Sequence, residues 1–485
     1  MIMTTAQREE RSLAPGARVH LVGIAGSGMS AIAWLLLGRG YTVSGSDLQK
    51  NRATDELEQA GATIFRGHQA QNIAGAGLLV VSAAVPGDNP ELVAARAAGL
   101  PILKRADLLG ELMAETVGVA VAGSHGKTTT TSLIPHVLLE SGRDPSFIAG
   151  GVLPGTGRNG RAGTGDILVV EADEYDHMFL GLRPQVAIVT NVEHDHPDIF
   201  PDESSYRDAF RQFARLLPAD GLLVACSDDP GVRALLQALE PAPFAITRYG
   251  LERDGQPEFQ AVDLRSNTLG GADFVVLRDE ETLGLARLRL PGRHNVRNAL
   301  AAIAVLDALG LTFAEMQGPL AEFGGVQRRF QVVGEAGEVT IIDDYAHHPT
   351  EIRVNLAAAR ERFPGRRLWA VWQPHTFSRT RLLLDDFAAS FDDADRVIVL
   401  DIYPSREKDT LGIDAGMVVE RMATHPYARH IGSRAEAAAY ILDRVRPGDV
   451  ILTLGAGDGD QVGQWILDGL KERMSQREGW QREDE

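Results

Sequence analysis

Cysteine is almost absent from the chain. Cys226 is the only one among 485 residues, which excludes an intrachain disulfide and fits a reducing compartment. Its neighbours, GLLVACSDDP, are typical of the end of a strand, and this favours a packed thiol over a nucleophile. The sequence therefore excludes a small fold held together by disulfides.

Long apolar runs and an excess of positive charge are missing as well. No run reaches the ~18 apolar residues that a membrane-spanning helix needs, and residues 1–18 lack the apolar core of a signal peptide. The formal net charge of −18 argues against nucleic acid or an anionic membrane as the main partner. We expect a cytoplasmic protein of about two to four domains that acts on small molecules, as a monomer or weak homodimer.

Lysine is scarce over most of the chain. Lys127 is the only lysine between Lys104 and Lys408, and it lies in the run VGVAVAGSHGKTTTT, residues 117–131. In that run an apolar segment breaks at Gly123 into a tight loop, which leads into the start of a helix. The pattern is typical of a loop that binds phosphate groups.

A loop of this shape has the right chemistry for a phosphate chain. Its backbone N–H groups turn inward, and the following helix contributes the positive end of its dipole. Lys127 would reach the outer phosphates, and the Thr128 hydroxyl would hold a magnesium ion. Val121 stands where the full motif has glycine, so the sequence has the shorter form G-S-H-G-K-T. We predict a nucleoside triphosphate site at this loop.

A second glycine-rich turn lies near the N-terminus. The apolar strand at 20–23 leads into GIAGSGMS, and a helical run follows at 29–37. Asp47 follows Gly28 at about the 20-residue spacing of an acid that binds a ribose hydroxyl. Ala25 replaces a glycine of the usual dinucleotide pattern. The turn predicts nucleotide binding without defining the nucleotide.

Strand-like and helix-like segments alternate along the whole chain. This alternation predicts an α/β fold, with parallel sheets that carry helices on both faces. We place the joints near Thr116 and Arg329, which gives three domains at residues 1–116, 117–329 and 330–485. The expected strands include 42–47, 78–82, 101–103, 339–342, 367–372, 397–400 and 450–454.

Two apolar runs in the middle of the chain end in acidic and histidine clusters. They are DILVVEADEYD, residues 166–176, and QVAIVTNVEHDHPDIF, residues 185–200. Ligands gather at the carboxyl ends of parallel strands, so both clusters should face the phosphate loop, with Glu171 and His196 as the candidates for function. An alternative is a transition-metal set made of His194, Asp195, His196 and Asp198.

Eight motifs, taken in order, resemble those of the Mur ligase family: GIAGSGMS, AGSHGKTTT, EADEYD, TNVEHDHPD, GRHNVRNAL, GVQRRF, DDYAHHPTEI and QPHTFSRT. The resemblance covers essentially the whole chain. It implies a Rossmann-like N-terminal domain that binds a UDP-sugar, a central P-loop ATPase-type domain, and a Rossmann-like C-terminal domain that binds an amino acid. The implied reaction joins L-alanine to the lactyl carboxylate of UDP-N-acetylmuramate through an acyl phosphate, with ATP and Mg²⁺ as cofactors.

The resemblance also implies roles for individual residues, matched position by position. ATP would be bound by Gly123, Ser124, His125, Gly126, Lys127, Thr128, Thr129, His294, Asn295, Arg329 and Asp344. Substrates would be bound by Gly23, Gly26, Ser27, Gly28, Met29, Ser30, Asp47, His68, Tyr345, His347, His348, His375 and Arg379. The metal ligands would be Thr128, Glu171 and His196, and the catalytic residues Lys127, His348 and Arg379.

Bland interpretations compete with some of these roles. Asn295 is also suited to a simple helix N-cap, and the histidine pair before Pro349 to a turn. The sequence departs from the family pattern at Ala25, Ser124, Tyr175 and Thr376, and Pro135 should kink the helix after the phosphate loop. No lysine occurs from 128 to 407, so the carbamylated lysine of several sister ligases is absent, as expected for the alanine-adding branch.

Other functions remain open at this stage. The nearest is a family member that attaches a recycled tripeptide to UDP-N-acetylmuramate. A dinucleotide-dependent oxidoreductase would explain the first glycine turn but leaves the phosphate loop without a role. A regulatory ATP-binding module would not need His375, Arg379 and DDYAHHP at other strand ends.

Overall fold

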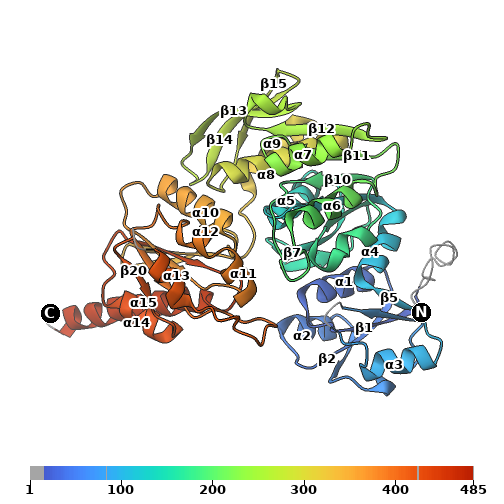
Figure 1. Ribbon diagram of the computed structural model, residues 1–485, viewed down its shortest axis with the longest axis horizontal. Helices are drawn as coiled ribbons and strands as arrows, with labels where there is room; N and C mark the ends of the chain where they lie inside the picture. The colour runs from blue at the N-terminus through green and yellow to red at the C-terminus, as the bar shows by residue number, and fades with distance from the viewer. Residues whose placement is uncertain (1–15, 83–84, 423–424, 484–485) are drawn as a thin grey trace.

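Three separate β-sheets, each covered by helices, make up the computed structural model, which describes residues 16–82, 85–422 and 425–483 (Figure 1). We call each sheet with its helices a unit: N-terminal, middle and C-terminal. The prediction of an α/β fold with three such units is confirmed. Residues 1–15, most of the segment judged to lack a signal peptide's apolar core, lie outside the described residues. No helix in the described ranges is both long and apolar enough to span a membrane.

The N-terminal unit has a five-stranded parallel sheet of order β3-β2-β1-β4-β5, which is the Rossmann order without its sixth strand. The strands are short and mostly apolar, apart from β2, which reads TVSGSD. The chain crosses over through an α-helix after β1, β2 and β4 and through the 3-10 helix η2 (Ala70–Ile73) after β3. Its elements are β1 (Arg18–Val22), α1 (Ser27–Gly38), β2 (Thr42–Asp47), α2 (Arg52–Gln59), β3 (Thr63–Arg66), β4 (Leu78–Val81), α3 (Pro90–Ala97), β5 (Ile102–Lys104) and α4 (Arg105–Ala114).

The middle unit is built on a ten-stranded sheet of order β15-β14-β13-β12-β11-β10-β6-β9-β7-β8. Its centre is parallel, and β8, β14 and β15 pair antiparallel at the two ends. Its elements are β6 (Val117–Ala122), α5 (Lys127–Glu140), β7 (Ser146–Leu153), β8 (Arg158–Arg161), β9 (Ile167–Glu171), η3 (Tyr175–Gly181), β10 (Val186–Val189), α6 (Glu203–Ala214), β11 (Leu222–Cys226), α7 (Pro230–Ala238), β12 (Ala245–Gly250), β13 (Phe259–Ser266), β14 (Ala272–Arg278), β15 (Glu281–Arg287), α8 (Arg293–Ala308) and α9 (Phe313–Glu322).

The C-terminal unit has a six-stranded sheet of order β16-β17-β21-β18-β19-β20, in which only β16 pairs antiparallel. The predicted strand at 450–454 agrees residue for residue with β21. Its elements are β16 (Gln331–Ala336), β17 (Val339–Asp344), α10 (Pro349–Arg362), β18 (Leu368–Trp372), α11 (Phe377–Leu382), α12 (Leu384–Ala388), β19 (Arg396–Val399), α13 (Ala415–Arg421), β20 (Ala428–His430), α14 (Arg434–Leu442), β21 (Val450–Leu454) and α15 (Asp460–Glu483).

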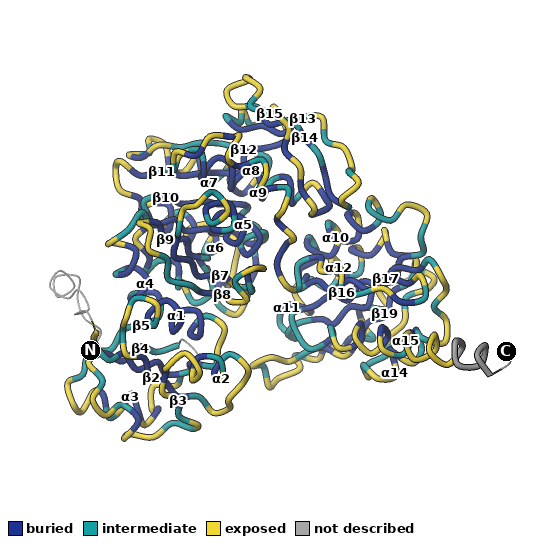
Figure 2. The backbone as a smooth tube through the Cα atoms, turned by 180° about the vertical axis from the view of Figure 1, so that it is seen from behind, coloured by how far each residue is buried: buried dark blue, intermediate teal, exposed yellow. Residues whose placement is uncertain are grey.

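The N-terminal and middle units share one apolar core. A single cluster of buried side chains runs from β1 and α1 into β6, β9 and α6, and α1 packs on β7 and β8. The C-terminal unit encloses its own clusters, on the two faces of its sheet. Burial is greatest along the central strands of all three sheets, while the outer loops are exposed (Figure 2).

Two local predictions resolve differently. Cys226 is buried at the end of β11, and burial raises the pKa of its thiol to about 11, so the packed, unreactive thiol is confirmed. Pro135 lies inside α5, but the helix continues through it to Glu140. The expected kink therefore does not end this helix.

Candidate active site

The loop between β6 and α5 is closely packed around two glycines. Gly123 has φ 142° and Gly126 has φ 79°, conformations that L side chains rarely adopt. A Cβ on Gly126 would lie 2.4 Å from Oδ1 of Asn298, so side-chain bulk is excluded as well. The glycines hold the loop's backbone at the start of α5, as the sequence predicted.

Lys127 lies under this loop and faces a buried carboxylate. Its Nζ is 2.9 Å from Oε2 of Glu174, whose side chain is fully buried, and it also donates to the carbonyls of Gly123 and Ser124. Burial alone would lower the pKa of Lys127, but Glu174 and Asp173 outweigh it and raise the pKa. Lys127 is therefore a fixed positive charge beside the loop.

Thr128, after the phosphate loop, and Glu171, in the first acidic cluster, are in contact, as the sequence predicted. Thr128 Oγ1 donates to Oε1 of Glu171 at 2.9 Å, and Nη2 of Arg329 lies 3.2 Å from the same hydroxyl. The backbone N–H of Gly150 donates to the other carboxylate oxygen. The C-terminal end of β9 thus lies against the first turn of α5, because β6 and β9 are parallel neighbours.

His196 joins the same region from the segment after β10. Its backbone is left-handed, with φ 56°, and its Nε2 lies 3.4 Å from Oε1 of Glu174. The transition-metal set that includes His194 is not assembled, because Nε2 of His194 faces the carbonyl of Phe200 and Asp195 pairs with Arg379. His196 is therefore placed with the phosphate-loop residues, and its Nε2 also lies 3.8 Å from Oδ2 of Asp195.

Arg379 and Asp195 form a buried ion pair between the middle and C-terminal units. Nε of Arg379 donates to Oδ1 of Asp195 at 2.9 Å, and both side chains are nearly fully buried. Burial would raise the pKa of Asp195, but Arg379 and the nearby histidines hold it well below its usual range. His375 lies one turn before Arg379, and burial lowers its pKa to about 4. This imidazole is therefore neutral near pH 7.

Two cavities meet at the phosphate loop. The smaller, about 250 Å³, is lined by His294, Asn295, Asn298, Arg297, Asp344 and Phe330. The larger, about 690 Å³, includes in its wall Lys127, Thr128, Glu171, His196, Tyr345, His347, His375 and Arg379, together with Ser27 of the N-terminal unit. The predicted side chains from all three units therefore converge on one connected region.

The two adenine-side candidates lie at the start of α8. Gly292 is the N-cap of this helix, so the N-cap interpretation of Asn295 is wrong. Nδ2 of Asn295 instead donates to the carbonyl of Pro291 at 2.8 Å, from the wall of the smaller cavity. Burial lowers the pKa of His294 to about 4, so its ring is neutral.

Asp344 ends β17 at the wall of the smaller cavity. Its carboxylate accepts from the backbone N–H groups of Phe330 and Ala346, both at 2.7 Å, and from Nδ2 of Asn355 at 3.0 Å. Burial raises its pKa to about 7. Asp344 therefore titrates near neutral pH.

The histidine pair divides between two positions. His347 lines the larger cavity, and burial lowers its pKa to about 3. His348 is the N-cap of α10, accepting from the N–H of Thr350 at 3.3 Å, and it is not among the residues that line either cavity. The pair therefore immediately precedes α10, with His348 as the N-cap of that helix.

His125, in the phosphate loop, reaches across to the C-terminal unit. Its Nε2 lies 2.9 Å from Oε2 of Glu193, and its Nδ1 lies 3.2 Å from Oε1 of Glu351 on α10. Burial disfavours the charged ring, but the hydrogen bonds to the two glutamates outweigh it and raise the pKa of His125 to about 10. The loop is therefore tied to α10 by an imidazolium.

The glycine turn of the N-terminal unit contacts the acid predicted to accompany it. The N–H of Ala25 donates to Oδ2 of Asp47 at 3.0 Å, and Gly23 has φ 86°. Nδ1 of His68 lies 2.9 Å from the hydroxyl of Ser46 and 3.2 Å from Oε2 of Glu91, which is fully buried. The predicted substrate residues of the turn itself are Gly23, Gly26, Ser27, Gly28, Met29 and Ser30, and they lie at the carboxyl end of β1.

Four carboxylates of the site were not identified as such from the sequence: Glu174, Glu193, Asp195 as the partner of Arg379, and Glu351. Glu351 had a signal, because it stands three residues after the capping residue His348, the spacing of a capping box. Glu174 lay in the EADEYD cluster, yet only its burial beside Lys127 separates it from the neighbouring acids.

The departures from the family pattern are accommodated locally. Ser124 keeps a hydroxyl, which donates to the carbonyl of Glu193 at 2.7 Å. The Tyr175 hydroxyl donates to Asp198 at 3.0 Å, at the wall of the larger cavity. Thr376 is the N-cap of α11, with φ 68°.

Comparison with known protein families covers most of the chain. Residues 18–116 match the Mur ligase family catalytic domain, residues 121–306 the Mur ligase middle domain, and residues 328–457 the Mur ligase glutamate ligase domain.

Individual proteins and structures agree with this. The chain is 49% identical to UDP-N-acetylmuramate–L-alanine ligase of Roseiflexus sp. (strain RS-1), over 94% of this chain and 99% of the relative. It is 44% identical to the enzyme of that name from Salinibacter ruber, over 91% and 92%. The crystal structure of UDP-N-acetylmuramate-alanine ligase from Thermotoga maritima matches with TM-score 0.78 and 30% identity, over 94% and 99%. The chain therefore belongs to the Mur ligase family.

Proposed function

We propose that this protein is an ATP-dependent ligase that joins L-alanine to the lactyl carboxylate of UDP-N-acetylmuramate, a step of peptidoglycan precursor synthesis. The observation that carries the proposal is the convergence of a phosphate loop, the buried Arg379 and three neutral histidines on connected cavities. The curated relatives, which carry the name of this activity at 42% to 49% identity, support it.

The chemistry needs an activated carboxylate. A carboxylate is a poor acceptor for an amine, because its oxygen is a poor leaving group. Transfer of the γ-phosphoryl group from ATP to the lactyl carboxylate forms an acyl phosphate and ADP. The amine of L-alanine then attacks the acyl carbon, and phosphate leaves as the amide forms.

ATP would occupy the smaller cavity and the loop. His294 and Asn295 would lie beside the adenine, and Asp344 would accept a hydrogen bond from the ribose. Lys127 and the loop N–H groups would hold the phosphates, which requires Lys127 to exchange Glu174 and two carbonyls for the incoming oxygens. The remaining proposed contacts are Gly123, Ser124, His125, Gly126, Thr128, Thr129 and Arg329.

Magnesium fits the residues present. Thr128 and Glu171 offer hard oxygen atoms 2.9 Å apart at the loop, and His196 lies on the same cavity wall. We propose these three as its ligands. The ion would neutralise phosphate charge that otherwise repels the attacking carboxylate.

The UDP portion of the sugar would bind at the N-terminal glycine turn, with Asp47 and His68 as its polar contacts. Ser27 lines the larger cavity, so a ligand on the turn extends toward Lys127 and Arg379. Arg379 would hold the developing negative charge of the tetrahedral intermediate.

The alanine amine must lose a proton before it attacks. His347 and His375 line the larger cavity as neutral rings, and pKa values of about 3 and 4 make them weak bases, so they would orient the amine by hydrogen bonding while its proton leaves to solvent. Tyr345 lies on the same wall. His348, which is off the wall, would act by positioning α10.

We further propose that the protein acts in the cytoplasm on small molecules, as a monomer or weak homodimer, with domains at 1–116, 117–329 and 330–485. The C-terminal unit would close over bound ATP and UDP-sugar and exclude water from the acyl phosphate. Small-angle scattering should show compaction with both ligands; unchanged dimensions would contradict closure.

The deciding experiment is phosphate release from ATP and Mg²⁺ with UDP-N-acetylmuramate, with L-alanine, with L-Ala-D-Glu-diaminopimelate, or with neither. We expect release only with L-alanine, and a UDP-muramoyl-alanine product by mass spectrometry. Release only with the tripeptide would assign the chain to the recycling branch of the family. Release in neither case would reject the ligase proposal.

Lys127→Ala separates the two nucleotide sites. We expect loss of turnover, with UDP-N-acetylmuramate affinity within about twofold of the unchanged protein, because Lys127 faces the phosphate loop and not the N-terminal turn. A comparable loss of UDP-substrate affinity would mean that the two sites are not separable.

A further inference from the structure

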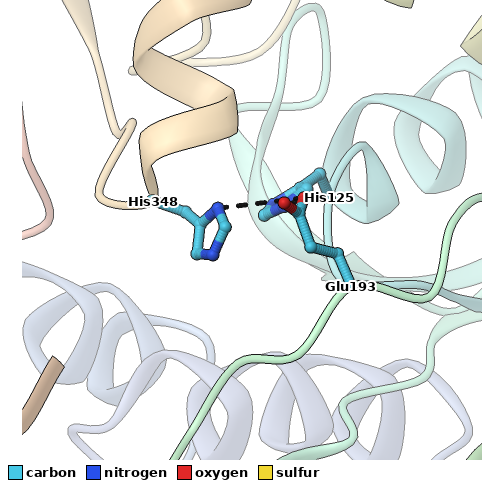
Figure 3. Close-up of side chains that lie close together, drawn as sticks. All are labelled: His125, Glu193 and His348. Carbon is cyan, nitrogen blue, oxygen red and sulfur yellow. Dashed lines mark hydrogen bonds and ion pairs between the residues drawn. The ribbon is translucent and has the colours of Figure 1, made fainter. Parts of the chain in front are cut away.

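Two histidines and one carboxylate bridge the middle and C-terminal units (Figure 3). His125 comes from the phosphate loop, Glu193 from the segment after β10, and His348 from the start of α10. One ligand atom from each lies within 4.8 Å of the other two. Oε2 of Glu193 is 2.9 Å from Nε2 of His125 and 3.9 Å from Nδ1 of His348.

We propose that these three side chains form a binding site for a transition-metal ion of the zinc class in the nucleotide-free protein. Two imidazole nitrogens and one carboxylate oxygen are a ligand set that zinc accepts, with water in a fourth position. Bond lengths of about 2.0–2.2 Å at tetrahedral angles place ligand atoms about 3.3–3.6 Å apart. The His125–Glu193 pair must therefore separate slightly and the more distant atoms must approach, which side-chain rotation provides. The proposal concerns an ion different from the magnesium proposed above.

The groups around the three ligands are those that metal sites use to orient them. When Nε2 of His125 binds the ion, its Nδ1–H donates to Oε1 of Glu351 at 3.2 Å. The Thr350 hydroxyl donates to Oε1 of Glu193 at 2.7 Å, which leaves Oε2 for the ion. A carboxylate that holds a histidine ligand, and a hydroxyl that holds a carboxylate ligand, are typical second partners at zinc sites.

His348 already presents the required nitrogen. Its side chain is 4% exposed, and its Nδ1 accepts from the N–H of Thr350, so Nδ1 carries a lone pair. The Nε2 atom has no hydrogen-bond partner among the described residues. An ion at Nδ1 would replace the long 3.3 Å bond to Thr350.

His125 must give up a proton to bind. In the metal-free structure its ring bridges Glu193 and Glu351, so it is protonated on both nitrogens. Binding displaces the proton on Nε2 to solvent, and the Nε2–metal bond forms in its place. The two glutamates then neutralise the divalent ion instead of the imidazolium.

The position of the site gives it a consequence for nucleotide binding. His125 lies between Ser124 and Gly126, so an ion that joins it to His348 fixes the phosphate loop to α10. ATP and zinc should therefore compete. This consequence rests on the proposed function, whereas metal binding itself does not.

Direct metal binding tests the proposal without any activity measurement. The full-length nucleotide-free protein is titrated with Co²⁺, followed by its visible absorption, and with Zn²⁺ against a chromophoric chelator. We expect one ion per chain, a four-coordinate Co²⁺ spectrum, and affinity at least about tenfold weaker in His125→Asn and in His348→Asn. Glu351→Gln, which removes only a second partner, should weaken affinity about 10- to 100-fold.

His430→Asn is the matched control, because His430 pairs with Asp401 on the surface of the C-terminal unit without a third ligand. It should leave zinc affinity unchanged. Absence of a stoichiometric ion, a six-coordinate spectrum, or binding that survives both histidine variants would overturn the site. If the variants fail to fold, the wild-type Co²⁺ stoichiometry and spectrum decide alone. Unchanged zinc affinity with saturating ADP would overturn the competition but not the site.

Discussion

The middle unit has a mostly apolar interface with the N-terminal unit and a charged interface with the C-terminal unit. Against the N-terminal unit it packs tightly and mostly through apolar groups: a Cβ on Gly160 of β8 would come 2.7 Å from Cα of Ala31 on α1. Trp34 of α1 is 7% exposed and lies under the guanidinium of Arg158, 3.7 Å from its ring centroid. Against the C-terminal unit it offers charges, as in Arg379–Asp195 and His125–Glu351.

This difference indicates which of the two interfaces stays closed and which one opens. An apolar interface is lost only by exposing its surface to water, so it holds two units as one body. A charged interface is rehydrated when it opens, so opening costs far less than the contacts suggest. We infer that the N-terminal and middle units form one body and that the C-terminal unit moves.

Trp34→Ala should have the largest effect on this comparison. It removes a large side chain from the shared core, and we expect the free energy of unfolding to fall by about 3–5 kcal/mol in urea denaturation. Trp465→Ala is the control, since Trp465 is 40% exposed on α15 and should change stability by less than about 0.5 kcal/mol. Equal effects of the two would contradict a shared core.

Arg379→Gln tests the charged interface. We expect kcat to fall by at least about 100-fold, equivalent to about 2.7 kcal/mol, while the urea midpoint moves less than in Trp34→Ala. The reason is that Asp195 is able to rehydrate when the units separate. Arg353→Gln, on the exposed side of α10, is the control. A stability loss as large as that of Trp34→Ala, with normal kcat, would refute the mobile interface.

Glu91→Gln tests whether a buried charge inside the N-terminal unit contributes more to stability than the charges between units. Burial would raise the pKa of Glu91, but the His20 ring, 3.8 Å away, and hydrogen bonds from Ser46 and Asn72 lower it from 4.5 to about 2. Its contribution is therefore complete above pH 4.5 and is lost as pH falls toward 2.

We expect Glu91→Gln to cost about 2 kcal/mol at pH 7 and to flatten the loss of stability between pH 5 and pH 3. Acid denaturation followed by circular dichroism measures both. Glu58→Gln, in an exposed pair with Lys50, should follow the unchanged protein. Parallel pH profiles for Glu91→Gln and the unchanged protein would show that Glu91 does not carry this dependence.

Thr350→Val should have the smallest effect. It removes one hydrogen bond across the charged interface, worth about 1 kcal/mol, so kcat/KM should fall about fivefold with unchanged stability. Ser266→Ala is the control, because its bond to Glu361 also joins the two units but is exposed. A larger loss of kcat/KM in the Ser266 variant would mean that the Thr350–Glu193 contact is not the important one between these units.

Local patterns were sufficient for most of the fold. The glycine loop before Lys127 and the parallel strands follow from apolar runs, breaks and alternation, which act over a few residues, whereas the order of the strands within each sheet was not predicted. The meeting of Thr128 with Glu171 was also predictable, since carboxyl ends of neighbouring parallel strands share one edge.

Partners from distant units were not predictable in the same way. Nothing in the sequence distinguishes Asp195 from its acidic neighbours until Arg379 is brought beside it from the C-terminal unit. The division of His347 and His348 has the same origin, because His348 caps α10 while His347, just before it, lines the larger cavity.

The sequence by itself determined the three α/β units, the phosphate loop and the residue types that its chemistry requires. Only the tertiary structure decided which charges are paired, which histidines are neutral and which interface is mostly apolar. The physical reason is the distance along the chain between the interacting groups. Strand, helix and loop preferences arise between near neighbours in the chain. Burial and ion pairing arise between groups that the fold brings together from far apart, such as His125 and Glu351.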